Sequence, residues 1–377
     1  MENLKINKFK KIEYFIFLIL FASSTFYLSG ITSFSPIYFL FFFSASCILT
    51  LAIFERLSFN LLIIYNIYIF ISIMLIQIPI AGIRRPFVSF LCHLYFVFIY
   101  WSGNHLSFEK IIKGSITAIK YIIIFYLIEL AIRINFRIND AIYALTNLLN
   151  NNYFYNFKEN SIIFMDSNHV AIVLLTIYFM LIYLKKEFKI NLLIYIVIVF
   201  ILILFTYSRA SIIATISFTF IYAFIRPQKI ENNKIAMIII ILLIVLSLKN
   251  IITMFSEDAS LLSKFYIFEQ IIKYTKTSNI KRLIIGVGYG NSPKFIGIGT
   301  HNLFFTYYIE GGILSLIEII SLYVYMLYKF ANIAYVLIPF IFAGLSFSPS
   351  AQTYLYCIIA IIILLEKKRG ENGHKRL

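Results

Sequence analysis

Long apolar runs, separated by short polar and basic stretches, dominate the sequence. An apolar run of about 17–25 residues can cross the hydrocarbon core of a bilayer as a helix, and this length predicts about twelve spans here. The sequence therefore predicts an all-α fold, a polytopic transmembrane helix bundle, with residues 1–377 forming one integral membrane domain. The expected spans are 14–30, 35–54, 59–79, 87–101, 115–132, 168–184, 190–206, 210–225, 235–253, 311–329, 333–347 and 351–365.

The composition supports a bilayer as the solvent. Hydrophobic residues make up 61% of the 377 residues and charged residues only 13%, with a mean hydropathy of +0.89. A water-soluble globule could not hide so much apolar surface. The basic N-terminus runs into an apolar stretch that is too long for a signal sequence, so we expect it to remain as the first membrane helix.

Two further classes of site are not expected from the composition. The net charge of +16 comes from short basic clusters between apolar runs, so nucleic acid is not an expected partner. Cys47, Cys92 and Cys357 lie inside apolar runs without metal-ligand spacing. We expect no disulfide, no metal site and no cofactor.

Basic residues in the short loops predict the orientation of the chain. Loops rich in Lys and Arg stay in the cytoplasm, and such clusters occur at 185–189, at 226–234 and at both termini. With an even number of spans, both termini are cytoplasmic. The longer loops 133–167 and 254–310 then fall on the outer, periplasmic face, and we expect the second to carry short helices.

Many cations nevertheless fall on the predicted outer face. Long loops escape the orientation rule, which explains most of these charges but not Arg209, where two apolar segments meet almost without a loop. This exception suggests a functional role for Arg209. The outward-facing cations are Arg84, Arg85, Arg133, Arg137, Lys158, Arg209, Lys264, Lys273, Lys276, Lys281, Arg282 and Lys294.

Two polar patterns stand at predicted helix starts on that face. Asp166 and Asn168 precede an apolar run, where such residues are more often helix caps than catalytic groups. Arg209 follows Ser208 in a tight turn, and its planar guanidinium suits the bidentate binding of a diphosphate, with the serine hydroxyl as a further donor.

The third pattern is a glycine stretch, Gly286-Val287-Gly288-Tyr289-Gly290, followed by Thr300-His301-Asn302 and Glu310-Gly311-Gly312. It follows no predicted strand, so a dinucleotide site is rejected. His301 is the best candidate for a general base because imidazole titrates near neutral pH. If 301–310 were one helix, Glu310 would lie on the face opposite His301. The glycines at 311 and 312 favour a bend into the membrane.

Taken in order, these patterns resemble the O-antigen polymerase and O-antigen ligase superfamily of bacterial inner-membrane glycosyltransferases. The resemblance covers about residues 160–347 and includes Asp166-Ser167-Asn168, Thr206-Tyr207-Ser208-Arg209, the glycine stretch, His301-Asn302 and Glu310-Gly311-Gly312. One position departs from the family, because Ser263-Lys264 stands where a Ser-Arg pair is usual. Either Lys264 or Arg282 therefore supplies the second contact to the diphosphate.

The resemblance implies a metal-independent glycosyltransferase of lipopolysaccharide biosynthesis. Its donor and its acceptor would be oligosaccharides on undecaprenyl diphosphate, and a chain-length regulator and a flippase are further partners that it suggests. It implies that Arg209, with Lys264 or Arg282, holds the diphosphate and that His301 accepts the acceptor's proton, with Ser208, Asn302, Glu310, Asp166 and Asn168 also lining the site. A polymerase is preferred. The alternatives are a ligase that transfers the glycan to lipid A core and, from another class, a transporter of the same lipid-linked sugar.

Overall fold

The computed structural model describes residues 2–29, 31–32, 35–54, 60–135, 157–158, 160–163, 165–224, 259–348 and 352–373. Every regular element in these ranges is a helix, which confirms the all-α prediction. The helices are α1 (Glu2–Ser23), α2 (Pro36–Phe54), α3 (Leu61–Ala81), α4 (Arg84–Asn104), α5 (Phe108–Asn135), α8 (Ser167–Phe188), α9 (Leu193–Leu204), α10 (Arg209–Phe224), α12 (Ala259–Thr277), α13 (Ile280–Ile285), α14 (Ser292–Ile296), α15 (Leu303–Lys329), the 3₁₀ helix η2 (Ala331–Ile333), α16 (Ala334–Gly344) and α17 (Thr353–Gly373).

Each predicted span overlaps one of these helices, except 235–253, which lies outside the described residues. Within the described part of the chain, five helices are long and apolar enough to cross a membrane, and the chain is accordingly a helical membrane protein. These five are α3, residues 85–104 of α4, α5, α8 and α15. Shorter apolar helices lie at 36–49, 193–204, 209–224 and 331–344.

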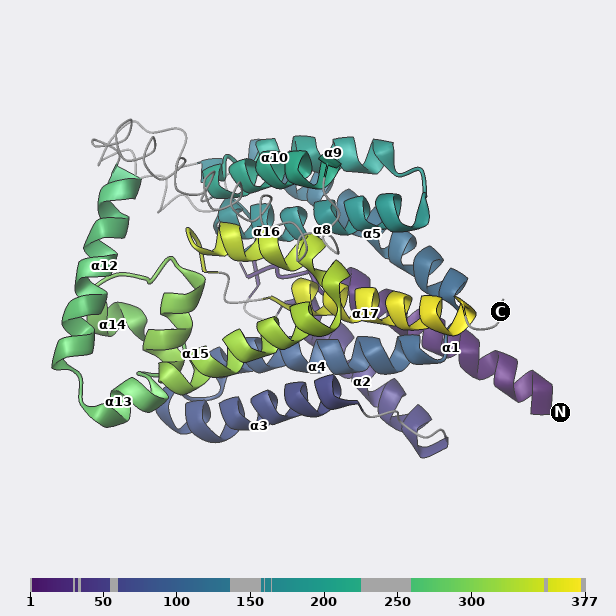
Figure 1. The fold of residues 1–377 in the computed structure, drawn as a ribbon, viewed down its shortest axis with the longest axis horizontal. Helices are drawn as coiled ribbons and strands as arrows, with labels where there is room; N and C mark the ends of the chain where they lie inside the picture. Colours follow the sequence, from purple (N-terminus) through teal and green to yellow (C-terminus); the bar gives the residue numbers. More distant parts are fainter. Residues whose placement is uncertain are drawn as a thin grey trace.

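The long helices run mostly side by side, with both termini at one end of the bundle (Figure 1). At the opposite end, α12 crosses the bundle, with α13 and α14 beside it (Figure 1). The predicted loop 254–310 thus carries helices, and it ends inside α15, which begins at Leu303 rather than near residue 311.

Two helices form the centre of the bundle because they are apolar on all sides. Every residue from 353 to 365 of α17 is buried, and α8 is buried along nearly its whole length. α17 packs against α4, α5 and α8, while α8 also packs against α9 and α16. The outer helices α3, α5 and α15 instead keep large apolar side chains exposed, as helices that border lipid do.

An ion pair is buried inside the span α5. Arg133, one of the cations on the predicted outer face, is not exposed to solvent: its Nη2 lies 3.5 Å from Glu129 Oε2, and both side chains are buried. Ser161 Oγ donates a 2.7 Å hydrogen bond to Glu129 Oε1. The two residues stand one helical turn apart, so the pair forms within one helix and neutralises both charges.

Removing one member of this pair leaves the other charge buried without its partner. We predict that Arg133→Met lowers the free energy of unfolding by about 3–5 kcal/mol, measured as a lower Tm of the purified protein in detergent. The double variant Glu129→Leu/Arg133→Met recovers most of this loss, because no buried charge remains. A single variant as stable as the wild type would contradict this account of the pair.

Candidate functional site

A cavity of ≈ 590 Å³ lies at the end of the bundle that carries α14 and the glycine stretch. Its walls come from the starts of α4, α8 and α15, from α14, from the loop before α2 and from the segment after α16. Hydroxyl and amide groups make up much of the lining, and the charged or titratable groups among them include Arg85, Asp166, His169, His301 and Glu310. Three residues predicted for the site, Asp166, His301 and Glu310, therefore meet in one space.

His301 lies just before α15 rather than inside it. Asn302 is the N-cap of that helix, and its Oδ1 accepts from the backbone N–H of Phe304 and Phe305 at 3.0 and 3.1 Å. The premise of a single helix over 301–310 is thus wrong, and His301 and Glu310 line the same cavity. Asn302 also donates from Nδ2 to the Leu345 carbonyl at 2.9 Å, which joins α15 to the end of α16.

The surroundings of His301 favour its neutral form. Partial burial in the cavity wall lowers the pKa of His301 below its ordinary value of 6.5; the carboxylate of Asp166 opposes this shift, and the charge of Lys264 adds to it. A neutral imidazole with its pKa below neutrality can accept a proton at pH 7. The lowered pKa is compatible with the general-base role inferred from the sequence, which stays a prediction.

Asp166 caps α8, as the sequence predicts. Its Oδ1 accepts from the backbone N–H of Asn168 at 2.8 Å. Burial raises the pKa of Asp166, while this hydrogen bond and the positive charge of Lys158 oppose the rise. The carboxylate therefore has two roles that are compatible: it starts a helix, and it lies close enough to His301 to act on its titration.

Lys158 is a cation near the cavity that the motif analysis did not select; it acts on Asp166, which lines the cavity. Burial lowers the pKa of its ammonium group, Asp166 opposes this shift, and the charge of Arg209 adds to it. Lys158 therefore lies within electrostatic range of both Asp166 and Arg209. One signal in the sequence pointed to it, since Lys158 is among the cations on the predicted outer face.

The predicted diphosphate residues divide into two groups. Arg209 is exposed at the first position of α10 and acts on Lys158, and Lys264 acts on His301 while its Nζ donates to Ser346 Oγ at 3.1 Å. None of these three cations lines the cavity itself, and Arg282 lies in α13, with its guanidinium 5.2 Å from the ring centre of Phe295. Lys264 is therefore the better placed of the two candidates for the second contact.

The turn that carries Arg209 is tied to the start of α8. Ser167 Oγ donates to the Thr206 carbonyl at 2.7 Å, and Ser208 is buried with its hydroxyl 3.4 Å from Ser211 Oγ. The Ser208 side chain thus contributes to the turn and is not part of the cavity lining.

Three non-glycine residues beside this site have left-handed backbone conformations. Met165, Tyr207 and His301 have φ of 51°, 54° and 43°, and each lies two residues before the start of α8, α10 or α15. Such conformations cost about 1–3 kcal/mol each and persist only where the surrounding structure requires them. Their concentration at three helix starts around one site is typical of a functional centre.

The glycine stretch is bound backbone to backbone against α15. The N–H groups of Val287 and Gly288 donate to the carbonyls of Ile309 and Glu310 at 3.0 and 2.9 Å. A Cβ on Gly286 would overlap the Glu310 carbonyl oxygen, and one on Gly312 would overlap the Ile284 carbonyl oxygen. α15 bends at Gly312 (φ 74°), as the paired glycines predict.

The Glu310 carboxylate holds the far end of the same stretch. Its Oε2 accepts from the Gly290 N–H at 2.7 Å, and its Oε1 accepts from Ser292 Oγ at 2.6 Å. Arg85 donates to the Gly290 carbonyl. These bonds occupy both carboxylate oxygens of Glu310, so its role is to position the loop that forms one wall of the cavity.

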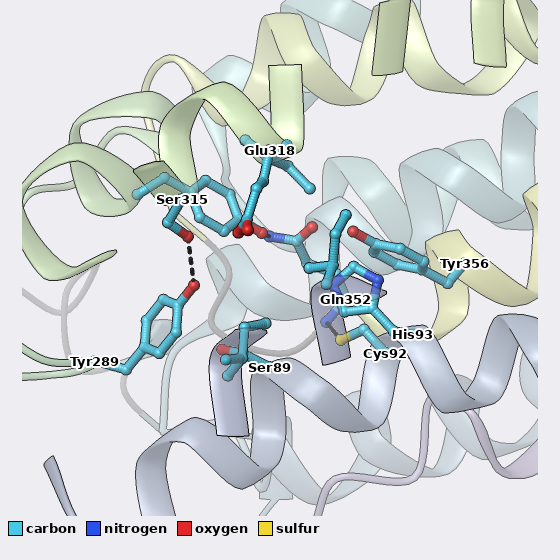
Figure 2. A pocket seen from close by; sticks show the side chains of 12 residues that line it. Ser89, Cys92, His93, Tyr289, Ser315, Glu318, Gln352 and Tyr356 are labelled. Carbon is cyan, nitrogen blue, oxygen red and sulfur yellow. Dashed lines mark hydrogen bonds between the residues drawn. The ribbon is translucent and has the colours of Figure 1, made fainter. Parts of the chain in front are cut away.

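A second cavity of ≈ 10 Å³ lies deeper in the bundle and shares Ser89, Tyr289, Tyr307 and Gln352 with the first. Figure 2 shows polar side chains converging on it, including His93 and Glu318. Tyr289 and Ser315 are joined by a 2.8 Å hydrogen bond between their hydroxyls, and Ser72 Oγ donates to Glu318 Oε1 at 2.8 Å. The volume is about that of one water probe. The Glu318 carboxylate therefore belongs to a local polar cluster between helices.

The close crossing at Gly286 gives a test of the loop. We predict that Gly286→Ala lowers the Tm of the purified protein far more than Gly82→Ala. Both glycines have similar positive φ (79° and 72°), but a Cβ at Gly82 would meet nothing within 4 Å. Gly82→Ala therefore measures backbone strain alone, about 1–3 kcal/mol, and the excess at Gly286 measures the steric overlap. Equal losses would show that the close approach is unimportant.

No protein-family model and no curated protein sequence matches this chain.

Proposed function

We propose that this chain is a membrane glycosyltransferase that polymerises a polyprenyl-diphosphate-linked oligosaccharide, as an O-antigen polymerase does. The observation that carries the proposal is a cavity lined by His301, whose pKa is lowered, and by the Asp166 carboxylate, with cations nearby: Lys264 acts on His301, Lys158 acts on Asp166, and Arg209 acts on Lys158. This set supplies a base for a sugar hydroxyl and positive charge for a leaving diphosphate.

The proposal places the chain in a bacterial inner membrane with about twelve spans and the cavity on the periplasmic face. Two features support this arrangement: the termini lie together at the end of the bundle opposite α12 (Figure 1), and the basic clusters at the chain ends have the composition of cytoplasmic segments. The cavity lies beside α14, at the end away from the termini. A lipid carrier in the same membrane would then bring its diphosphate to the depth of the site.

In the proposed reaction, the donor diphosphate lies among Arg209, Lys158 and Lys264. His301 accepts the proton of an acceptor sugar hydroxyl as that oxygen forms a bond to the anomeric carbon of the donor. The bond from that carbon to the diphosphate oxygen breaks, and the carrier diphosphate leaves with the electron pair. The three cations offset the negative charge that develops on the leaving group, and Asp166 stabilises the imidazolium that forms.

The lipopolysaccharide ladder of cells that lack this gene tests the function. We predict that wild type and Arg282→Ala restore a full ladder, whereas His301→Ala and Arg209→Ala leave single-repeat lipopolysaccharide at matched membrane expression. Loss of the base is expected to lower the rate about 10²–10⁴-fold. Arg282 is the matched control because it is an exposed arginine of the same region that is not among the charges acting on His301, Asp166 or Lys158.

Analysis of the carrier-linked glycans in the same strains separates the alternatives. Loss of all attached O-antigen, with polymer accumulating on its carrier, would make the protein a ligase. Lipid-linked repeats retained on the cytoplasmic side would make it a transporter. A full ladder with Arg209→Ala would remove Arg209 from the reaction.

The pH dependence of the purified enzyme tests the base separately. The neutral form of His301 is the active one, so the rate rises with pH through the pKa of His301, which lies below 6.5, and is level near neutrality. Lys264→Gln removes a charge that lowers this pKa, so the acidic limb of the pH–rate profile moves to higher pH. Asp166→Asn keeps a residue suited to the helix cap but removes a charge that raises the pKa, so the limb moves to lower pH.

The control is Lys281→Gln, because Lys281 is an exposed lysine away from the cavity. This variant is expected to leave the acidic limb of the pH–rate profile at the same pH. If the acidic limb lies at the same pH in the wild type and in all three variants, His301 is not the group whose titration controls the rate.

A further inference from the structure

One face of α12 carries an apolar stripe that stays largely exposed, although the ring centre of Phe268 lies 6.2 Å from that of Phe305 on α15. Phe265, Phe268 and Ile272 are 55%, 52% and 41% exposed. Their spacing of three and four residues places them on one side of the helix. A different side of α12, formed by Ile267, Ile271 and Tyr274, is buried in a small core with Val287, Ile296 and Ile309. The exposed stripe is therefore additional to the face that attaches α12 to the protein.

The segment that contains α12 carries mostly positive charge. Between residues 259 and 300 the sequence has six cations and one acidic residue, Glu269; the cations are Lys264, Lys273, Lys276, Lys281, Arg282 and Lys294. All six are exposed. Lys273 and Lys276 lie on α12 itself, on the side of the stripe away from the buried face. An aromatic stripe next to lysines is the composition of helices that lie in a membrane interface.

The direction of α12 fits the same environment. The helix crosses the end of the bundle, whereas the long helices that it caps run along the bundle axis (Figure 1). If those helices cross the bilayer, α12 lies in the plane of the membrane at the level where they leave it. A helix at that depth can place its apolar stripe against acyl chains and its lysines against headgroups.

We propose that α12 is an interfacial helix that binds the surface of an anionic bilayer, with Phe265, Phe268 and Ile272 inserted at the boundary between headgroups and acyl chains and Lys273 and Lys276 contacting the phosphates. This inference goes beyond the proposed function and does not depend on it. The occupant of the stripe is the lipid of the surrounding membrane, because the cations beside the stripe match anionic headgroups.

Contact with lipid at this helix has a consequence for the cavity. Lys264 belongs to the same helix, one residue before Phe265, and its Nζ bonds to Ser346 Oγ, close to the cavity residues Phe347 and Ser348. The depth of α12 in the interface therefore sets the position of a cation that acts on the cavity residue His301. A substrate anchored in the same lipid would meet that cation at the membrane surface.

A single tryptophan reporter tests the proposal in the full-length protein. The chain has one tryptophan, Trp101, so a Trp101→Phe background allows Phe268→Trp and Lys273→Trp to be compared after reconstitution into phosphatidylglycerol/phosphatidylethanolamine vesicles. These positions are five residues apart, about 140° around the helix. We expect lipids brominated near the headgroup end of the acyl chain to quench the reporter at position 268 at least about twofold more than the reporter at position 273, and acrylamide in the aqueous phase to show the reverse order.

Three outcomes would overturn the proposal. Equal quenching of both reporters by acrylamide would place the stripe in water, and protection of the reporter at position 268 from both quenchers would indicate a protein contact, such as a second copy of the chain. Undiminished lipid quenching in purely zwitterionic vesicles would remove the role of the lysines. Phe265→Trp, on the same stripe, replaces Phe268→Trp if that variant does not fold. Because the readout is depth and not activity, it stands even if the proposed reaction is wrong.

Discussion

The site depends on one backbone contact, the crossing of the glycine stretch with α15 at Gly286 and Gly312. Only residues without a Cβ can approach this closely, and the resulting bonds from Val287 and Gly288 to α15 replace the side-chain packing that would otherwise separate the two segments. The Glu310 carboxylate then holds Gly290 and Ser292. This arrangement brings the loop back onto the bundle and closes one wall of the cavity.

Electrostatics around that cavity follow from partial burial combined with an excess of cations. His301 and Lys158 both have lowered pKa values because charged forms are poorly solvated there, and Asp166 opposes the shift at each. The result is an uncharged imidazole beside fixed positive charge. Chemistry that needs both a base and a binding place for an anion is well suited to this combination.

Features with local causes could be predicted from the sequence, whereas those that depend on distant segments could not. The Asp166 cap and the bend at Gly312 follow from a few neighbouring residues, and ten or more apolar residues in a row predict a helix wherever it packs. The placement of Lys158 beside Asp166 and the bonding of Glu310 to Gly290 required the folded chain. The pairing of Arg133 with Glu129, one helical turn earlier, could be predicted from their spacing, whereas the burial of both side chains could not.

The most direct test of the central claim is product analysis with the purified protein in liposomes that contain a defined polyprenyl-diphosphate-linked oligosaccharide. Mass spectrometry would follow both products. The account predicts glycans that grow by whole repeats, with one free polyprenyl diphosphate released for each new glycosidic bond and neither product formed by His301→Ala. Unchanged lipid-linked oligosaccharide, or substrate moved across the bilayer without a new glycosidic bond, would contradict it.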